Sequence, residues 1–83
     1  MPEKSEEAVQ QAVRSAWLQA LDLDSADLDD DFFELGGHSL AAIEIIDSID
    51  ASLGVEVDVG VLYEVGTLRA LIRACVERLR KES

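Results

Sequence analysis

The stretch that most constrains this chain is Phe32-Phe33-Glu34-Leu35-Gly36-Gly37-His38-Ser39-Leu40. It follows six aspartates within residues 22–31 and leads directly into an apolar-rich segment with a helical pattern. Two glycines before a serine allow positive φ angles and a close approach by another molecule. A serine on the first turn of a helix lies beside unpaired amides, which suit a phosphate. The residues alone therefore leave two roles open for Ser39, a helix cap or an attachment site for a phosphodiester.

Apolar residues at spacings of three and four predict an all-α fold with three long helices and one short one. The first helix is expected over about residues 5–21, with Ser5 as its N-cap, and the second over about residues 39–53, followed by Gly54. A short third helix is expected near residues 59–64, and a fourth runs from its cap Thr67 to about residue 80. The expected architecture is a four-helix bundle with a long loop between its first two helices.

The same spacing predicts which residues form the core. The buried stripes of the three long helices are Val9, Ala12, Val13, Ala16, Trp17 and Ala20; Ala42, Ile45, Ile46, Ile49 and Leu53; and Leu68, Leu71, Ile72, Cys75, Val76 and Leu79. The loop residues expected to anchor on this core are Leu23, Leu28, Phe32, Phe33 and Leu35. Valines at 55, 57, 59 and 61 alternate as in a strand, but a single strand would lack a partner, so an extended linker is predicted. We expect stability to depend strongly on Ile45, Ile49, Phe33 and Leu71.

Charge is spread unevenly along the chain, whose formal net charge is −11. No Lys or Arg occurs between residues 15 and 68, where thirteen Asp and Glu fall, and five of the seven basic residues follow from Arg69 onward. Such a field repels nucleic acid and anionic lipid and attracts basic protein surfaces. There is no apolar run of membrane-spanning length and no signal-peptide pattern. We expect a cytoplasmic monomer that binds neither nucleic acid nor membrane.

Catalytic and metal-binding interpretations fail on the residues present. Residues 37–41 come close to the G-x-S-x-G elbow of hydrolases, but the only histidine is His38, and the chain is too short for the large sheet that the elbow requires. A calcium loop starting at Asp22 or Asp27 would place Phe33 or His38 at the position of the bidentate glutamate. Cys75 lies on a buried stripe and is expected to be a structural thiol. We expect no catalytic residue and no metal.

Asp31 together with residues 32–40 resembles the phosphopantetheine attachment motif of carrier proteins, in the form typical of the peptidyl (thiolation) carriers of nonribosomal peptide synthetases. The similarity continues through residues 53–57, 62–64 and 67–68, so that it covers essentially the whole chain. The resemblance implies one carrier domain over residues 1–83, the four-helix fold of the acyl-carrier type, and no catalytic activity of its own.

The resemblance also implies the site and its partners. Ser39 would be the attachment residue for 4′-phosphopantetheine, within a motif that includes Gly36, Gly37 and His38, and a phosphopantetheinyl transferase would add the group from coenzyme A. The thiol of this arm would hold acyl or aminoacyl groups as thioesters for adenylation (loading), tailoring and condensing enzymes of nonribosomal peptide or polyketide biosynthesis. The positions expected to contribute to partner docking are Leu40, Ile43, Glu44, Asp47, Asp50, Leu62 and Tyr63. Helical spacing independently places Leu40 and Ile43 on the acidic face, away from the core.

Some residues depart from the pattern of peptidyl carriers. Asp58 stands where these carriers commonly have Pro, Val65-Gly66 where they often have His-Pro, and Gly60 is unusual in a third helix. The acidic middle leans toward free-standing acyl carriers. A start at Met1 favours a stand-alone carrier, although a domain cut from a longer protein would look the same. The competing interpretation is an unmodified acidic helical adaptor for a basic protein, which would have no need of residues 36–39.

Overall fold

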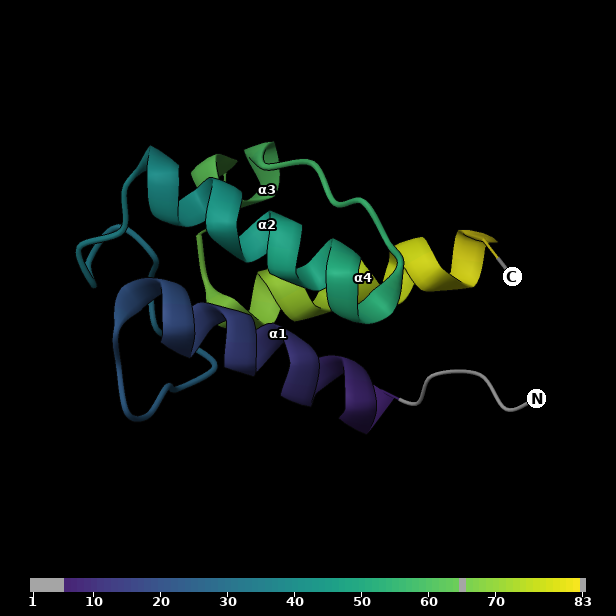
Figure 1. Ribbon diagram of the computed structural model, residues 1–83, viewed down its shortest axis with the longest axis horizontal. Helices are drawn as coiled ribbons and strands as arrows, with labels where there is room; N and C mark the ends of the chain where they lie inside the picture. The colour runs from purple at the N-terminus through teal and green to yellow at the C-terminus, as the bar shows by residue number, and fades with distance from the viewer. Residues whose placement is uncertain (1–5, 65, 83) are drawn as a thin grey trace.

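Four helices surround one core in the computed structural model, which describes residues 6–64 and 66–82 (Figure 1). Helix α1 spans Glu6–Leu21, α2 Ser39–Leu53, α3 Gly60–Glu64 and α4 Leu68–Glu82. Helix α1 runs antiparallel to α2 and α4 and packs against both, while α3 packs against α4. The described segments form no strand and only one isolated bridge, between Asp31 and Thr67. The predicted all-α four-helix bundle with a long first loop is confirmed.

Local capping signals set the ends of the helices. Gly54 ends α2 in the left-handed conformation, with φ 68°, and its amide donates to the Asp50 carbonyl at 2.8 Å. Thr67 caps α4, because its hydroxyl oxygen accepts the amide of Ala70 at 3.1 Å. Both ends were predicted from the sequence. The predicted cap Ser5 lies outside the described residues.

Asp58 caps the short helix α3, which accounts for its presence in place of proline. Its carboxylate accepts the Gly60 amide at 2.9 Å, and its carbonyl accepts the Val61 amide at 3.0 Å. The helix therefore begins at Gly60, one residue later than predicted. Gly66 has φ +82°, an angle that proline cannot adopt. Its carbonyl accepts the Phe32 amide at 2.7 Å, so this second departure also has a structural role.

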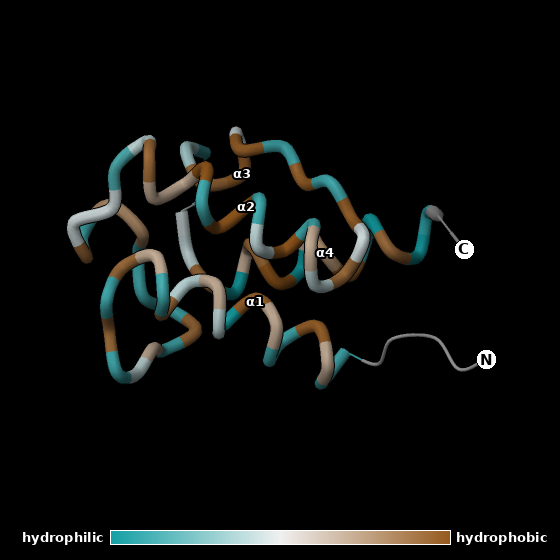
Figure 2. The backbone as a smooth tube through the Cα atoms, viewed as in Figure 1, coloured by the Kyte–Doolittle hydropathy of each residue, from teal (hydrophilic) through white to brown (hydrophobic). Residues whose placement is uncertain are grey.

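The core combines the apolar faces of the long helices with Phe32 from the loop and Leu62 from α3. Along each helix, hydrophobic and hydrophilic positions alternate with the helical period (Figure 2). The buried helical residues are Val9, Val13, Ala16, Trp17, Ala41, Ala42, Ile45, Ile49, Leu53, Leu68, Leu71, Ile72 and Cys75. The predicted core residues that prove only partly buried are Ala12, Ala20, Ile46, Val76 and Leu79. Ala41, which was not predicted, is buried beside Ala42.

The linker between α2 and α3 is extended, as predicted, and it belongs to the core. Val55 and Val57 are buried, and Val59 packs against the core from its edge. Figure 2 shows the alternation of hydrophobic and hydrophilic residues along this segment. The period of two thus buries every second side chain of a single extended segment without a partner strand.

The end of the long loop is fixed to the start of α4 by backbone hydrogen bonds. The Phe32 amide donates to Gly66, the Leu68 amide to Asp30 at 3.1 Å, and the Arg69 amide to Leu28 at 2.8 Å. Phe32 is fully buried, with its ring 6.0 Å from that of Trp17. The predicted anchors Leu28 and Leu35 also pack on the core, and Leu23 is half-buried.

The prediction that Phe33 is a core residue is wrong, because its side chain is 45% exposed. Phe32 pairs with Gly66 through its backbone and points its ring into the core. Phe33 belongs to the turn of residues 32–36, in which the Asp31 carbonyl accepts the Leu35 amide at 3.1 Å, and this turn leaves its side chain exposed. The Phe33 ring instead lies against the rings of Phe32 and Tyr63, at centroid distances of 5.2 and 5.4 Å.

The two glycines before α2 serve different purposes. Gly36 has φ +90°, which favours glycine, and open space where a side chain would begin. A Cβ on Gly37 would lie 2.5 Å from ring atoms of Phe32, so only glycine allows the chain to cross this ring. The Gly37 amide donates to the Phe32 carbonyl at 2.8 Å. Phe32 and the two glycines therefore together fix the path of the backbone that leads to Ser39.

Ile49→Ala should lower the free energy of unfolding by about 2–5 kcal/mol, because Ile49 is fully buried in the core. Ile43→Ala removes the same atoms from the same helix at a site that is 53% exposed, so it should change this free energy by less than about 0.5 kcal/mol. Urea denaturation followed by circular dichroism would measure both. Equal losses in the two variants would contradict the assignment of the faces of α2.

Gly37→Ala should lower the free energy of unfolding by about 1–3 kcal/mol, because the new methyl group displaces the buried Phe32 ring. The same substitution in a Phe32→Leu background should cost less, since the smaller side chain leaves room for the methyl group. Denaturation midpoints of the four proteins in this cycle would measure the coupling. Additive losses would show that the Phe32 ring is not what requires glycine at position 37.

Candidate functional site

Ser39 is exposed at the first position of α2. His38 precedes it as the N-cap residue, in an extended conformation with φ −143° and ψ 177°, and makes no capping bond through its side chain. The His38 carbonyl accepts the amide of Ala42 at 3.0 Å. The cap position considered for Ser39 thus belongs to His38, which was expected to be a helix-start residue. Within the described residues the Ser39 hydroxyl makes no hydrogen bond.

The start of α2 is suited to an anionic group. The first amides of a helix lack carbonyl partners and carry the positive end of the helix dipole. The first turn of α2 contains no acidic residue that could neutralise this end, whereas α1 places Glu6 and Glu7 on its own first turn. A phosphate bonded to the Ser39 oxygen would therefore lie in a favourable field.

The exposed face of α2 combines apolar and acidic side chains. Leu40 is 59% exposed and Ile43 is 53% exposed, although both are large and hydrophobic. The acids of this face, all exposed, are Glu44, Asp47 and Asp50. Ile45 and Ile49 on the opposite face are fully buried. The structure confirms the face assignment made from helical spacing, with Ser39 at the end of an exposed apolar and acidic strip.

Of the two α3 residues expected to meet partners, only one is available. Leu62 is fully buried in the core, so its expected docking role is wrong: its side chain cannot contact another protein in this fold. In this five-residue helix, Leu62 is the residue whose side chain is buried in the core. Tyr63 is 50% exposed and contacts the half-exposed Phe33. Sequence reasoning missed Phe33 as an exposed residue, because both phenylalanines lie in a turn, where no period in the sequence indicates which side chain faces the core.

The acidic loop carries local hydrogen bonds. The Asp31 carboxylate accepts the amides of Phe33 and Glu34 at 2.8 and 3.2 Å, and that of Asp27 accepts the Asp29 amide at 3.0 Å. These are turns stabilised by aspartate side chains. In residues 6–64 and 66–82, no group of three or more His, Cys, Asp or Glu side chains is placed to hold a metal ion.

Cys75 is fully buried on α4, and burial raises the pKa of its thiol to about 11. Deprotonation is thus suppressed near neutral pH, which makes this thiol unreactive, as expected for a structural cysteine. None of the described helices has both the length and the apolar character needed to cross a membrane.

The family comparison agrees with this geometry. Residues 11–75 match the family model described as "Phosphopantetheine attachment site". Among curated proteins, malpinin synthetase of Mortierella alpina is 43% identical over 63 residues, which cover 76% of this chain and 1% of the synthetase. The chain spans only 1–2% of the length of the first curated relatives it matches, two of which are named as a nonribosomal peptide synthase and a probable nonribosomal peptide synthetase.

Two solved structures share the fold. The type-II acyl-carrier protein BlmI of Streptomyces verticillus, involved in bleomycin biosynthesis, superposes with a TM-score of 0.81 at 27% identity, covering 89% of each chain. A peptidyl carrier protein in complex with the phosphopantetheine transferase Sfp and coenzyme A superposes with a TM-score of 0.80 at 26% identity, covering 93% of this chain and all of the other. With the match over residues 11–75, these likenesses show that the chain belongs to the family of phosphopantetheine-binding carrier proteins.

Proposed function

We propose that Ser39 is the residue to which 4′-phosphopantetheine is attached. Members of this family carry that group covalently, and attachment needs a hydroxyl that a transferase can reach. The observation that carries the assignment is the position of Ser39, exposed on the first turn of α2 with a hydroxyl that has no hydrogen bond to any described residue.

The surroundings of Ser39 fit a phosphodiester. The first-turn amides of α2 supply donors and positive potential without a nearby first-turn acid. Open space surrounds Gly36, in the turn before α2. The Gly37 amide donates to the Phe32 carbonyl, and this hydrogen bond fixes the backbone before the serine. These residues orient the Ser39 oxygen and leave its outer side accessible.

When attached, the arm supplies a terminal thiol that holds an acyl or aminoacyl group as a thioester. The chain itself presents the tethered group to other enzymes and thereby raises its effective concentration at each active site. Similarity to nonribosomal peptide synthetases supports a role in making such peptides, with loading by an adenylation enzyme and delivery to condensing or tailoring enzymes. A single carrier domain over residues 1–83, a monomeric state and a cytoplasmic location stay predictions.

The exposed face of α2 is proposed as the docking surface for these enzymes. It consists of Leu40, Ile43, Glu44, Asp47 and Asp50, with Tyr63 from α3. Exposed acids on a helix contribute little to stability, so their concentration on one face suits attraction of a basic partner. Leu40 and Ile43 can bury apolar area in a complex.

Ser39→Ala should abolish the addition of one phosphopantetheine group when the chain is incubated with coenzyme A and a broad-specificity transferase. Intact mass would measure the addition, and circular dichroism should show an unchanged helical spectrum. Ser52→Ala removes the same hydroxyl from an exposed site at the other end of α2 and should leave the mass shift intact. A full mass shift in Ser39→Ala would refute the site, and no shift in the unaltered chain would favour the unmodified adaptor.

Charge reversal of the docking surface should slow association with the transferase. Asp47→Lys with Asp50→Lys removes attraction for a basic partner, so the association rate should fall and depend less on salt. The control Glu7→Lys with Asp24→Lys makes the same change in net charge at exposed sites outside α2 and should have a smaller effect. Ile43→Ala should mainly speed dissociation. Stopped-flow kinetics at low salt would decide, and equal slowing by both double variants would exclude a specific role for α2.

A further inference from the structure

Four large hydrophobic side chains are exposed among the described residues, and they gather in one region. Leu40, Ile43 and Tyr63 belong to the docking surface, and the fourth, Phe33, contacts Tyr63. Hydrophobic side chains scattered singly over a surface need no explanation, whereas a cluster of them marks an interaction site. The docking surface on α2 and α3 leaves Phe33 without a role, although it belongs to the same cluster.

Phe33 and Tyr63 form an aromatic pair that is ordered by the fold. Their ring centroids are 5.4 Å apart, and about half of each side chain is exposed. The buried ring of Phe32 supports the Phe33 ring in an edge-to-face contact at 5.2 Å. The Phe33 amide donates to the Asp31 carboxylate at 2.8 Å, which stabilises the turn that carries the ring. The aromatic pair therefore needs little ordering when a partner binds, and this lowers the entropic cost of association.

The Phe32 ring connects the aromatic pair to the backbone that leads to Ser39. That ring packs against Phe33 and against Gly37, where an added Cβ would lie 2.5 Å from it. Gly37 precedes Ser39 by two residues, which span at most about 7 Å of extended chain. An enzyme that reaches the Ser39 oxygen therefore also comes close to the aromatic pair.

Acidic side chains flank the aromatic pair. Glu34 follows Phe33 and Glu64 follows Tyr63, and both glutamates are exposed. The chain has no Lys or Arg between residues 15 and 68, so none from this interval neutralises them. The face of an aromatic ring attracts an ammonium or guanidinium group, and a carboxylate nearby adds a charge-assisted hydrogen bond. The aromatic pair with its two glutamates therefore fits an arginine or lysine side chain that is surrounded by apolar groups.

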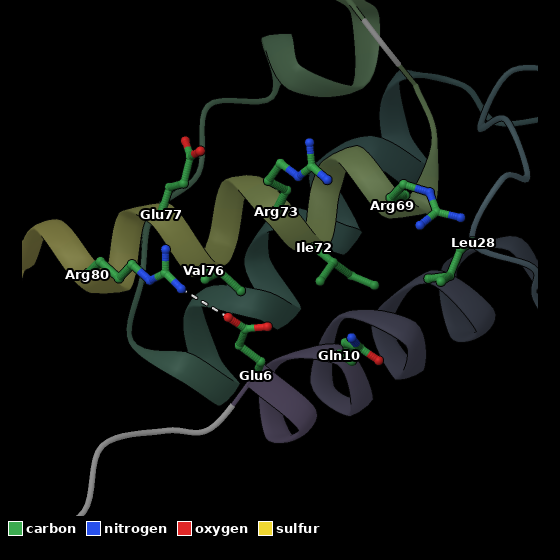
Figure 3. Close-up of a pocket in the computed structure, with 9 residues that line it drawn as sticks. All are labelled: Glu6, Gln10, Leu28, Arg69, Ile72, Arg73, Val76, Glu77 and Arg80. Carbon is green, nitrogen blue, oxygen red and sulfur yellow. Dashed lines mark hydrogen bonds and ion pairs between the residues drawn. The ribbon is translucent and has the colours of Figure 1, made fainter.

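The groove between α1 and α4 lacks such a uniform charge (Figure 3). Its charged lining mixes carboxylates with guanidinium groups, from Glu6, Glu77, Arg69, Arg73 and Arg80. Arg80 is paired with Glu6 at 3.0 Å, as the dashed line in Figure 3 shows. The mixed charges of this groove favour no particular partner, whereas the acids beside the aromatic pair favour a basic one.

We propose that the aromatic pair is a second anchor beside the α2 face of the docking surface, and that it binds an arginine or lysine side chain of the transferase that modifies Ser39. This inference rests on the proposed attachment at Ser39. The cation is attracted by the ring faces and by Glu34 and Glu64, and apolar groups around it cover the exposed parts of the rings. Contacts on both α2 and the aromatic pair orient the enzyme at Ser39.

Kinetics of phosphopantetheine transfer can test the aromatic pair, because the transferase acts before the arm is present. Tyr63→Ser should raise the KM for the carrier chain about fivefold to tenfold and change kcat less than about twofold, since it removes binding that precedes the chemical step. Phe33→Ser should act in the same way. Tyr63→Phe keeps the ring and should stay within about twofold of the unaltered chain. Intact mass would measure the initial rates, and circular dichroism would verify that each variant keeps its helical fold.

A matched pair of double variants tests the charge of the bound side chain. Glu34→Gln with Glu64→Gln leaves both rings in place and should raise the KM about threefold or more at low salt, because it removes attraction for a cation. Glu7→Gln with Asp24→Asn makes the same change in net charge at exposed sites away from the aromatic pair, so it should change the KM less. Equal increases in the two double variants would reduce the effect to overall charge and overturn the proposal.

The remaining outcomes separate this proposal from the attachment at Ser39. Normal modification with an unchanged KM in Tyr63→Ser and Phe33→Ser would overturn the role of the aromatic pair and leave the attachment site intact. If, in addition, the ring resonances of Phe33 and Tyr63 shifted on modification, the arm itself would be the occupant. No modification of the unaltered chain would overturn both proposals.

Discussion

The packing of Phe32 is the constraint on which the rest of the structure depends. Its ring fills the core beside Trp17, its amide donates to Gly66 before α4, and its carbonyl accepts the amide of Gly37. One residue thus connects α1, the start of α4 and the turn that leads into α2. The loop between α1 and α2 would otherwise be free to place Ser39 in many ways. Because Gly37 crosses the Phe32 ring with no room for a side chain, the approach to the serine is set by core packing.

The acidic residues divide into two groups with different physical roles. Those of the loop and linker, such as Asp31 and Asp58, accept backbone amides within a few residues and build turns and a helix cap. Those of α2 make no such bonds among the described residues, and they surround exposed Leu40 and Ile43. Selection for stability alone does not explain the second group, because exposed charges of one sign repel each other. A surface for other proteins explains both its charge and its exposed apolar side chains.

The two faces of helix α2 have different roles: one packs in the core, and the other is exposed to solvent. Its inner face supplies Ile45 and Ile49 to the core, and its outer face and first residue are exposed, as the proposed docking and attachment roles require. In a domain this small, total stability is about 5–15 kcal/mol, so the inner face leaves little room for change. The fold therefore places core residues and the exposed residues of the proposed site on one helix.

The sequence by itself determined the long helices, their buried faces and the place of Ser39 at the start of α2. Periodicity placed α2 at residues 39–53, and Gly54 and Thr67 marked helix ends through local geometry. These features depend on contacts within about one turn of chain, which a sequence displays directly. Only the tertiary structure decided that Phe32 is buried and Phe33 exposed, and that α3 turns Leu62 inward and Tyr63 outward. Residues in a loop or a single short turn have no extended period, so their direction follows from distant partners such as Gly66 and Trp17. The pairing of residues 28–32 with the start of α4 joins segments almost forty positions apart, and no local pattern encodes it.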